Sequence, residues 1–250
     1  MSTNIATRSQ AIALPDYIKK GDVRGSENIG NADIKFPALK LAQSTTKETK
    51  KHEAVCIEGL HEGELFNSVT REVYGDAPIH FVVVNQLGHR NVEFDPLDRN
   101  IVIDGNVPDA DPRCEFTEKI VDGQKIRVNP IAVRFYDYLL LVLFGNREPE
   151  LLTLSLKKTQ LKKAVGLNSI IKLSKLPAFA HLFKGTPVPE SRGQNAWYGW
   201  RFDQAGWPPE DLFTLASKYY DQYANKVITV ETEEPEGDAA GDAAAGDQPF

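Results

Sequence analysis

From residue 64 to 156 the sequence shows the pattern of β-strands, in which apolar and polar residues alternate or a short apolar run is bounded by turn residues. Strands are predicted at 64–74, 78–85, 91–94, 101–103, 116–121, 124–128, 131–144 and 150–156. The segment 78–85 is rich in β-branched residues, and 131–144 is long and apolar enough for a central strand with 150–156 beside it. Asp122-Gly123 predicts a hairpin between its flanking strands, and a turn at Gly88 predicts another between 78–85 and 91–94.

The period lengthens to that of a helix after residue 157. The first predicted helix covers 158–173, and its inward side is formed by Leu161, Ala164, Val165, Asn168 and Ile171. A turn at 177–183 and a returning strand at 194–202 follow. The last helix begins at Pro208-Pro209-Glu210-Asp211, since proline and acidic residues favour a first turn. Its predicted inward side is formed by Leu212, Leu215, Tyr219 and Tyr223.

These elements predict a mainly β fold of the α+β class. We expect an OB-fold-like, partly open barrel with inserted and C-terminal helices, and a β-sandwich is the alternative. The 250 residues divide into a flexible N-terminal arm at 1–33, an OB-like nucleic-acid-binding domain at 34–227 and a disordered acidic tail at 228–250.

Charge is distributed unevenly along the chain. It has 29 basic and 35 acidic residues, but seven of the acids follow Lys226, after which no basic residue occurs. The remaining body therefore has a net charge of +1, and the negative net charge of the whole chain does not argue against a nucleic-acid partner.

Catalytic motifs are missing from the sequence. There is no Walker A, GxGxxG, HExxH or GxSxG sequence, and the five histidines show no metal-ligand spacing. Cys56 and Cys114 are expected to be reduced thiols. We expect no enzyme activity, no cofactor and no metal. The polar N-terminus and the short apolar run at 138–145 predict a cytoplasmic protein without a membrane partner.

Basic residues concentrate in two segments. Residues 147–201 contain ten Lys or Arg against three acids, a charge of +7, and 35–51 contains five Lys against Glu48. Such segments are able to follow a phosphate backbone, and neighbouring aromatic rings stack on bases. The alternative is a solvated lysine-rich surface.

The candidate DNA-binding residues are these cations and the aromatic residues near them. They are Lys157, Lys158, Lys162, Lys163, Arg192, Tyr198, Trp200, Arg201, Arg134, Tyr136, Lys47, Lys50 and Lys51. On a strand, Tyr198, Trp200 and Phe202 share one face, and either Tyr198 or Trp200 is expected to stack on a base. At least one of Trp197 and Trp200 is expected to be a core residue instead.

The acidic tail has an aromatic end. A terminal ring fits an apolar pocket on a partner while the carboxylates meet a basic rim, which makes Asp247, Pro249 and Phe250 candidate partner-binding residues. A generic acidic tail is the alternative. The ending resembles those of bacterial and phage single-stranded DNA-binding proteins.

Three internal stretches carry a second resemblance. FPALKLAQS from Phe36, GELFNSVTREVYG from Gly63 and LSLKKTQLKKAVGLNS from Leu154 resemble a family of tailed-phage proteins, some of which are assigned as single-stranded DNA-binding proteins. The resemblance covers most of residues 34–207. It implies an OB-like fold and a role in phage DNA replication or recombination.

We therefore expect sequence-independent binding and protection of single-stranded DNA, with the tail recruiting replication or recombination proteins and competing with DNA for the cations. A single-strand annealing protein and a phage interaction or structural protein that does not bind DNA are the alternatives. Self-association into a homo-oligomer is left open.

Overall fold

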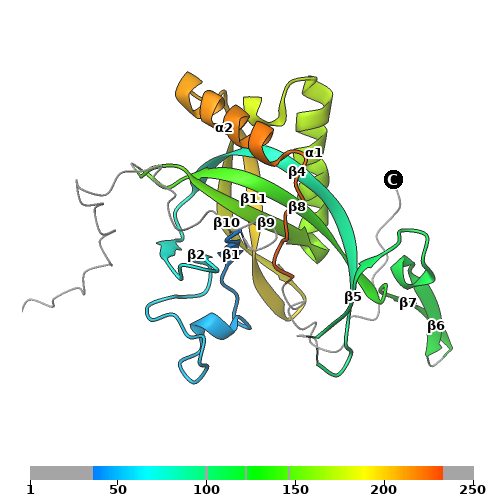
Figure 1. Ribbon diagram of the computed structural model, residues 1–250. Helices are drawn as coiled ribbons and strands as arrows, with labels where there is room; N and C mark the ends of the chain where they lie inside the picture. The colour runs from blue at the N-terminus through cyan, green and yellow to red at the C-terminus, as the bar shows by residue number, and fades with distance from the viewer. Residues whose placement is uncertain (1–35, 99–100, 122, 146, 233–250) are drawn as a thin grey trace, which may run out of the picture.

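The computed structural model describes residues 36–98, 101–121, 123–145 and 147–232 (Figure 1). The predicted arm at 1–33 and the predicted partner-binding residues Asp247, Pro249 and Phe250 lie outside this part of the chain. The main sheet has six strands, in the order β11-β10-β4-β8-β9, with β5 also paired to β4. Their bounds are β4 Ile79–Phe94, β5 Val102–Val107, β8 Ala132–Leu143, β9 Glu150–Lys157, β10 Leu182–Arg192 and β11 Asn195–Gly206.

Two smaller sheets and two helices complete the described part. Strands β1 (Leu39–Leu41), β2 (Leu65–Asn67) and β3 (Val73–Gly75) form one small sheet, and β6 (Thr117–Val121) and β7 (Gln124–Val128) form a separate hairpin. The helices are α1 (Leu161–Ser174) and α2 (Glu210–Tyr223). Short 3₁₀ turns are η2 Lys47–Thr49, η3 Pro112–Cys114, η4 Lys158–Gln160 and η5 Ala178–Ala180.

The central strand β8 supplies core residues to both faces of the sheet. Tyr138 and Leu140 belong to the cluster that includes α1, whereas Leu139 and Leu141 belong to the cluster that includes α2. Since successive side chains of a strand point to opposite faces, α1 and α2 cover opposite faces of the sheet. The buried Tyr138 hydroxyl donates to Asn168 of α1 over 2.9 Å, which satisfies its polar end.

The fold class predicted from the sequence is confirmed. The structure is mainly β with antiparallel sheets, and these sheets do not close into a barrel. The central position of β8, its pairing with β9, the β6–β7 hairpin and both helices also agree with the predictions. The inward side of α2 is confirmed as well, since Leu212, Leu215, Tyr219 and Tyr223 all pack in the cluster beneath it.

Three local predictions are corrected. Residues 78–94 do not fold back at Gly88, because β4 runs for 16 residues and takes up Gly88 (φ 101°) at a register shift against β8. A bulge of this kind bends a strand instead of ending it. In α1 the buried positions are Ala164 and Leu167, while Val165 is exposed. Strand β10 was not predicted, since it contains Pro187 and Pro189.

The chain returns to the sheet after α2. Ile228 packs in the cluster of α2, Glu231 lies 3.8 Å from the Lys40 ammonium, and the Thr232 hydroxyl accepts a 2.6 Å hydrogen bond from Arg90. Residues 228–232, which fall within the segment 228–250 predicted to be a tail, therefore make contacts with the folded body. Within the described residues, no helix has the length and apolar character needed to cross a membrane.

Candidate nucleic-acid interface

A groove lies between α1 and the β10–β11 hairpin, and we call it the α1–β11 groove. It has a volume of about 400 Å³, and three of the predicted DNA-binding residues, Lys163, Trp200 and Arg201, line it. Apolar side chains from both elements complete most of the lining, among them Ile170, Val188 and Phe202. The groove thus combines two cations with an apolar and aromatic interior, and its size is within the range of small-ligand sites.

Trp200 belongs to the core and is only 4% exposed. Its ring stacks on Phe202 at 5.6 Å and lies so close to Gly185 that a Cβ there would be 3.1 Å from the indole. Gly185 is therefore the residue that lets β10 approach this ring. The burial argues against Trp200 as the ring that stacks on a base, which leaves Tyr198 of the two residues expected for that role, and it confirms the expectation that at least one tryptophan of this strand is core.

Tyr198 is half-buried against the first small sheet. A Cβ at Gly63 would lie 2.6 Å from its ring, so the two are in close contact. Its backbone N–H donates to Gln43 over 2.8 Å, and its carbonyl accepts from the same carboxamide over 2.9 Å. The stacking role expected for Tyr198 stays a prediction.

Glutamine side chains cap the outer edge of β11. The Gln43 side chain accepts from the backbone N–H of Tyr198, and the Gln160 carboxamide oxygen accepts a 2.9 Å hydrogen bond from the backbone N–H of Trp200. These N–H groups point away from β10, where the paired residues are Pro189 and Pro187. Proline is tolerated there because its missing N–H would also point away from the neighbouring strand. Beyond Gly185, β4 no longer pairs with β10, so no ladder bond is lost.

One carboxylate offsets part of the positive charge in the groove. Glu190 forms an ion pair with Lys163 and accepts a 2.8 Å hydrogen bond from the Trp197 indole N–H. Burial acts to raise the pKa of Glu190, but the hydrogen bonds from Lys163 and Trp197 outweigh it and hold that pKa below its usual value. Arg201 forms a well-exposed pair with Asp203 at 3.2 Å, and such a pair is weak in water.

Other predicted site residues are separated by the sheet. Lys157 is in register with Phe135 and lies 5.7 Å from its ring centroid, whereas the next residue of β8, Tyr136, points to the opposite face. Arg134 is on the Tyr136 side and donates to Asn91 and Asp109.

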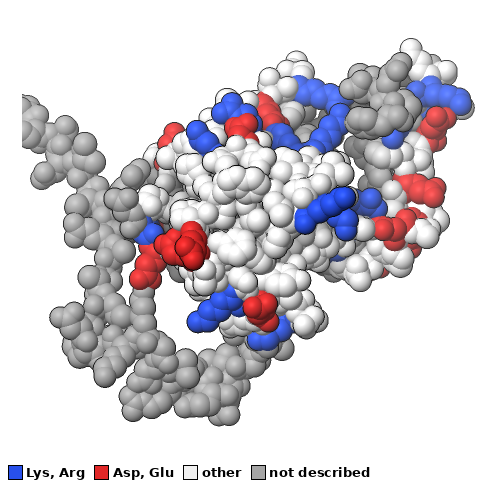
Figure 2. Space-filling view, turned by 90° about the horizontal axis from the view of Figure 1, so that it is seen from above, with Lys and Arg blue, Asp and Glu red and all other residues white. Residues whose placement is uncertain are grey.

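The remaining candidates are spread over several elements. Lys158 lies in η4, Lys162 is exposed on α1, and Arg192 is exposed at the end of β10. The lysines Lys47, Lys50 and Lys51 belong to η2 and the loop after it. Figure 2 shows the Lys and Arg residues of one face in several separate groups with acids among them. The groove therefore collects some predicted residues, but the structure does not join all of them into one stripe.

A buried ionic cluster on the α2 side of the sheet was not predicted. The Asp137 carboxylate accepts from Arg90 Nε over 2.7 Å and from the Ser155 hydroxyl over 2.5 Å. The Arg90 guanidinium also lies 4.8 Å from the Phe135 ring centroid and donates to Thr232. An aspartate inside the otherwise apolar central strand is the sequence feature that could have predicted this cluster, since a buried acid needs a partner.

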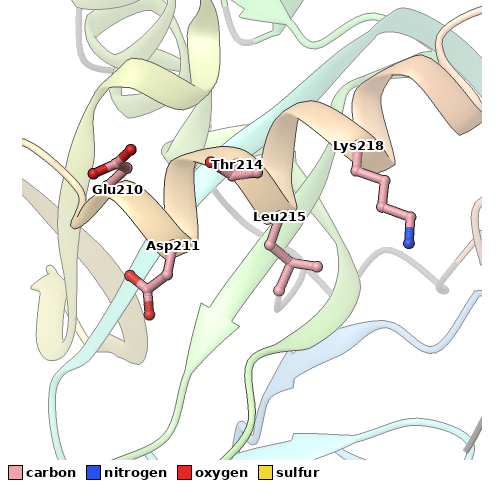
Figure 3. Close-up of a pocket in the computed structure, with 5 residues that line it drawn as sticks. All are labelled: Glu210, Asp211, Thr214, Leu215 and Lys218. Carbon is pink, nitrogen blue, oxygen red and sulfur yellow. The ribbon is translucent and has the colours of Figure 1, made fainter.

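A second, open depression follows one side of α2. Glu210, Asp211, Thr214, Leu215 and Lys218 line it, and its volume is about 740 Å³. Asp211, Leu215 and Lys218 point to the same side of the helix, while Glu210 points elsewhere (Figure 3). The two acids at the start of α2 and Lys218 two turns later lie along one helix, so these charges do not converge on one ligand. Across the residues that the structure describes, His, Cys, Asp and Glu form no group of three or more that could hold a metal ion.

The fold and groove define a class of protein: a mainly β domain with helices on both faces of one antiparallel sheet and a basic, apolar-lined groove at one helix. The chain belongs to the Pam3 phage gp34-like protein family, whose model matches residues 7–229. It is therefore a phage protein. No curated protein and no solved structure matches the chain.

Proposed function

We propose that this phage protein binds single-stranded DNA without strong sequence preference and protects it during phage DNA replication or recombination. The α1–β11 groove is the observation that carries the proposal. In this proposal Lys163 and Arg201 contact phosphates, and the apolar side chains that line the groove with them suit the faces of unpaired bases. Duplex DNA keeps its bases stacked inside, so it would not fill such an interior. The role is one of binding, without catalysis.

The groove charges give opposite expectations for two variants. Arg201→Ala should weaken binding of oligo-dT and flatten the dependence of log affinity on log salt by about 0.7 for one lost phosphate contact. Glu190→Gln should strengthen binding, since it removes a negative charge from the groove and keeps an oxygen that accepts from Trp197. Fluorescence anisotropy at about 50 and about 200 mM salt measures both effects.

Arg147→Ala is the matched control, because Arg147 forms a similar exposed pair with Glu72 outside the groove. The salt dependence of oligo-dT affinity for this variant should equal that of the unaltered protein. Equal affinity for duplex DNA would contradict the single-strand preference. No binding of any nucleic acid would favour the alternative of a phage protein that does not act on DNA, and pairing of complementary strands would favour an annealing protein.

We also propose that the acidic C-terminal residues compete with DNA and that Phe250 recruits a replication or recombination protein. Deleting 233–250 removes six acids and leaves the contacts of Ile228 and Thr232 in place. This deletion should tighten oligo-dT binding, most strongly at low salt, where charges are least screened.

Deleting Phe250 alone separates the ring from the charge. The DNA affinity of that variant should equal that of the full chain, while its binding to a purified replication or recombination protein of the same phage should be lost. Unchanged DNA affinity after deletion of 233–250 would refute the competition. Unchanged partner binding without Phe250 would refute the recruiting role.

A further inference from the structure

Two strands at one end of the molecule have a free edge. In the described part of the chain, β5 pairs only with β4, and β6 pairs only with β7. Both strands lie at the same end of the molecule, where the β6–β7 hairpin projects from the body (Figure 1). A free edge exposes unpaired backbone donors and acceptors, which a further strand can use.

The side chains of these edges are unusually apolar for exposed strands. Ile103 of β5 is 56% exposed and Ile120 of β6 is 73% exposed, and the adjacent Val102 and Val121 are exposed as well. A two-stranded hairpin without a covered face is marginally stable in water. Both edges would therefore gain from a partner strand.

The two strands complement one another in sequence. An antiparallel alignment that places Asp104 opposite Lys119 also places Ile103 opposite Ile120 and Val102 opposite Val121. Apolar pairs and opposite charges are the cross-strand combinations that stabilise a sheet. The partner that this edge fits is thus already present in the chain itself.

The connection between β5 and β6 holds them in different sheets within one molecule. Arg113 of η3 binds Glu93 of β4 over 2.5 Å, Asp111 over 2.7 Å and Asp104 over 3.3 Å. These ion pairs fix the connection against the β4–β5 end. Among the described residues, the complementary edges of one molecule therefore stay unpaired with each other and remain available to another molecule.

We propose that β5 of one copy pairs with β6 of a second copy, and β6 of the first with β5 of the second. Because both edges lie at one end, a two-fold axis makes the contact twice and closes the assembly as a dimer. The pairing adds the β6–β7 hairpin of each copy to the main sheet of the other copy. It does not depend on the proposed binding of DNA.

Charge reversal tests the pairing. Light scattering coupled to gel filtration should show the full chain passing from the 27.8 kDa monomer to twice that mass as its concentration rises. Lys119→Asp places two acids opposite each other at both contacts and should raise the dimer dissociation constant by about tenfold or more. The double variant Asp104→Asn with Lys119→Asp removes this repulsion, keeps a side-chain oxygen that can accept from Asn106 and Arg113, and should recover part of the lost affinity.

Controls separate the interface from general effects. Ile120→Glu should abolish the dimer, while Leu173→Glu, at a residue of α1 that is 79% exposed, should leave it intact. Both variants alter exposed positions, so at concentrations where the unaltered protein is monomeric their melting temperatures should match its own. A monomer at every concentration would overturn the proposal. A dimer that survives both Ile120→Glu and Lys119→Asp would overturn it too, since the contact would then lie elsewhere.

Discussion

Trp200→Ala should lower the free energy of unfolding by about 3–5 kcal/mol, the usual cost of removing a large aromatic side chain from a core. The indole is buried, stacks on Phe202 and rests on Gly185, so its loss leaves a cavity that the strands cannot close. Urea unfolding followed by circular dichroism measures the change. DNA binding should be compared only where the variant is still folded.

Trp207→Ala provides the matched control. Trp207 comes directly after the same strand, but its side chain is 64% exposed and its ring contacts the ring of His181. Its replacement should cost about 1 kcal/mol or less, as is usual at the surface. If Trp200→Ala instead weakened DNA binding strongly without lowering stability, Trp200 would be a stacking residue and its assignment to the core would fail.

Asp137→Ala should also lower the free energy of unfolding by about 3–5 kcal/mol, the range seen when one partner of a buried ion pair is removed. Arg90 would keep a charge that is largely withdrawn from water, and the Ser155 hydroxyl would lose its acceptor. The C-terminal contact between Arg90 and Thr232 should loosen at the same time. Amide hydrogen exchange at 228–232 reports on that second effect.

Asp203→Ala is the control for this substitution. It removes the partner of Arg201 from a pair in which both side chains are more than half exposed, and such pairs contribute about 0–1 kcal/mol. A small effect for both variants would mean that Arg90 finds another partner. In that case the Arg90–Asp137 pair would not be what holds the C-terminal segment on the sheet.

Local patterns determined most of the architecture. The apolar character of 131–144 predicts the central strand β8, Asp122-Gly123 predicts the β6–β7 hairpin, and the Pro-Pro-Glu-Asp sequence predicts the start of α2. These features depend on neighbouring residues alone, because strand period, turn dihedrals and helix caps are set over a few positions. The mainly β class follows from them directly.

The candidate site was predicted only in part. Basic and aromatic composition directed attention to Lys163, Trp200 and Arg201, which do line one groove. The same criteria gave equal weight to Lys157 and Tyr136, which the sheet separates. Composition counts charges, but it does not report that Glu190 pairs with Lys163 or that Asp109 pairs with Arg134.

The sequence by itself determined the central strand β8 with its neighbour β9, the β6–β7 hairpin, both helices and the segregation of acidic charge to the C-terminal end. The tertiary structure alone decided the remaining features, since each depends on residues far apart in the chain. Strand β10 forms despite two prolines because β4 stops pairing at Gly185, and β4 continues through Gly88 because β8 holds it on both sides of the bulge. Trp200 became a core residue because α1 and β10 enclose it. Burial and pairing are collective properties of the packed chain, and no local period encodes them.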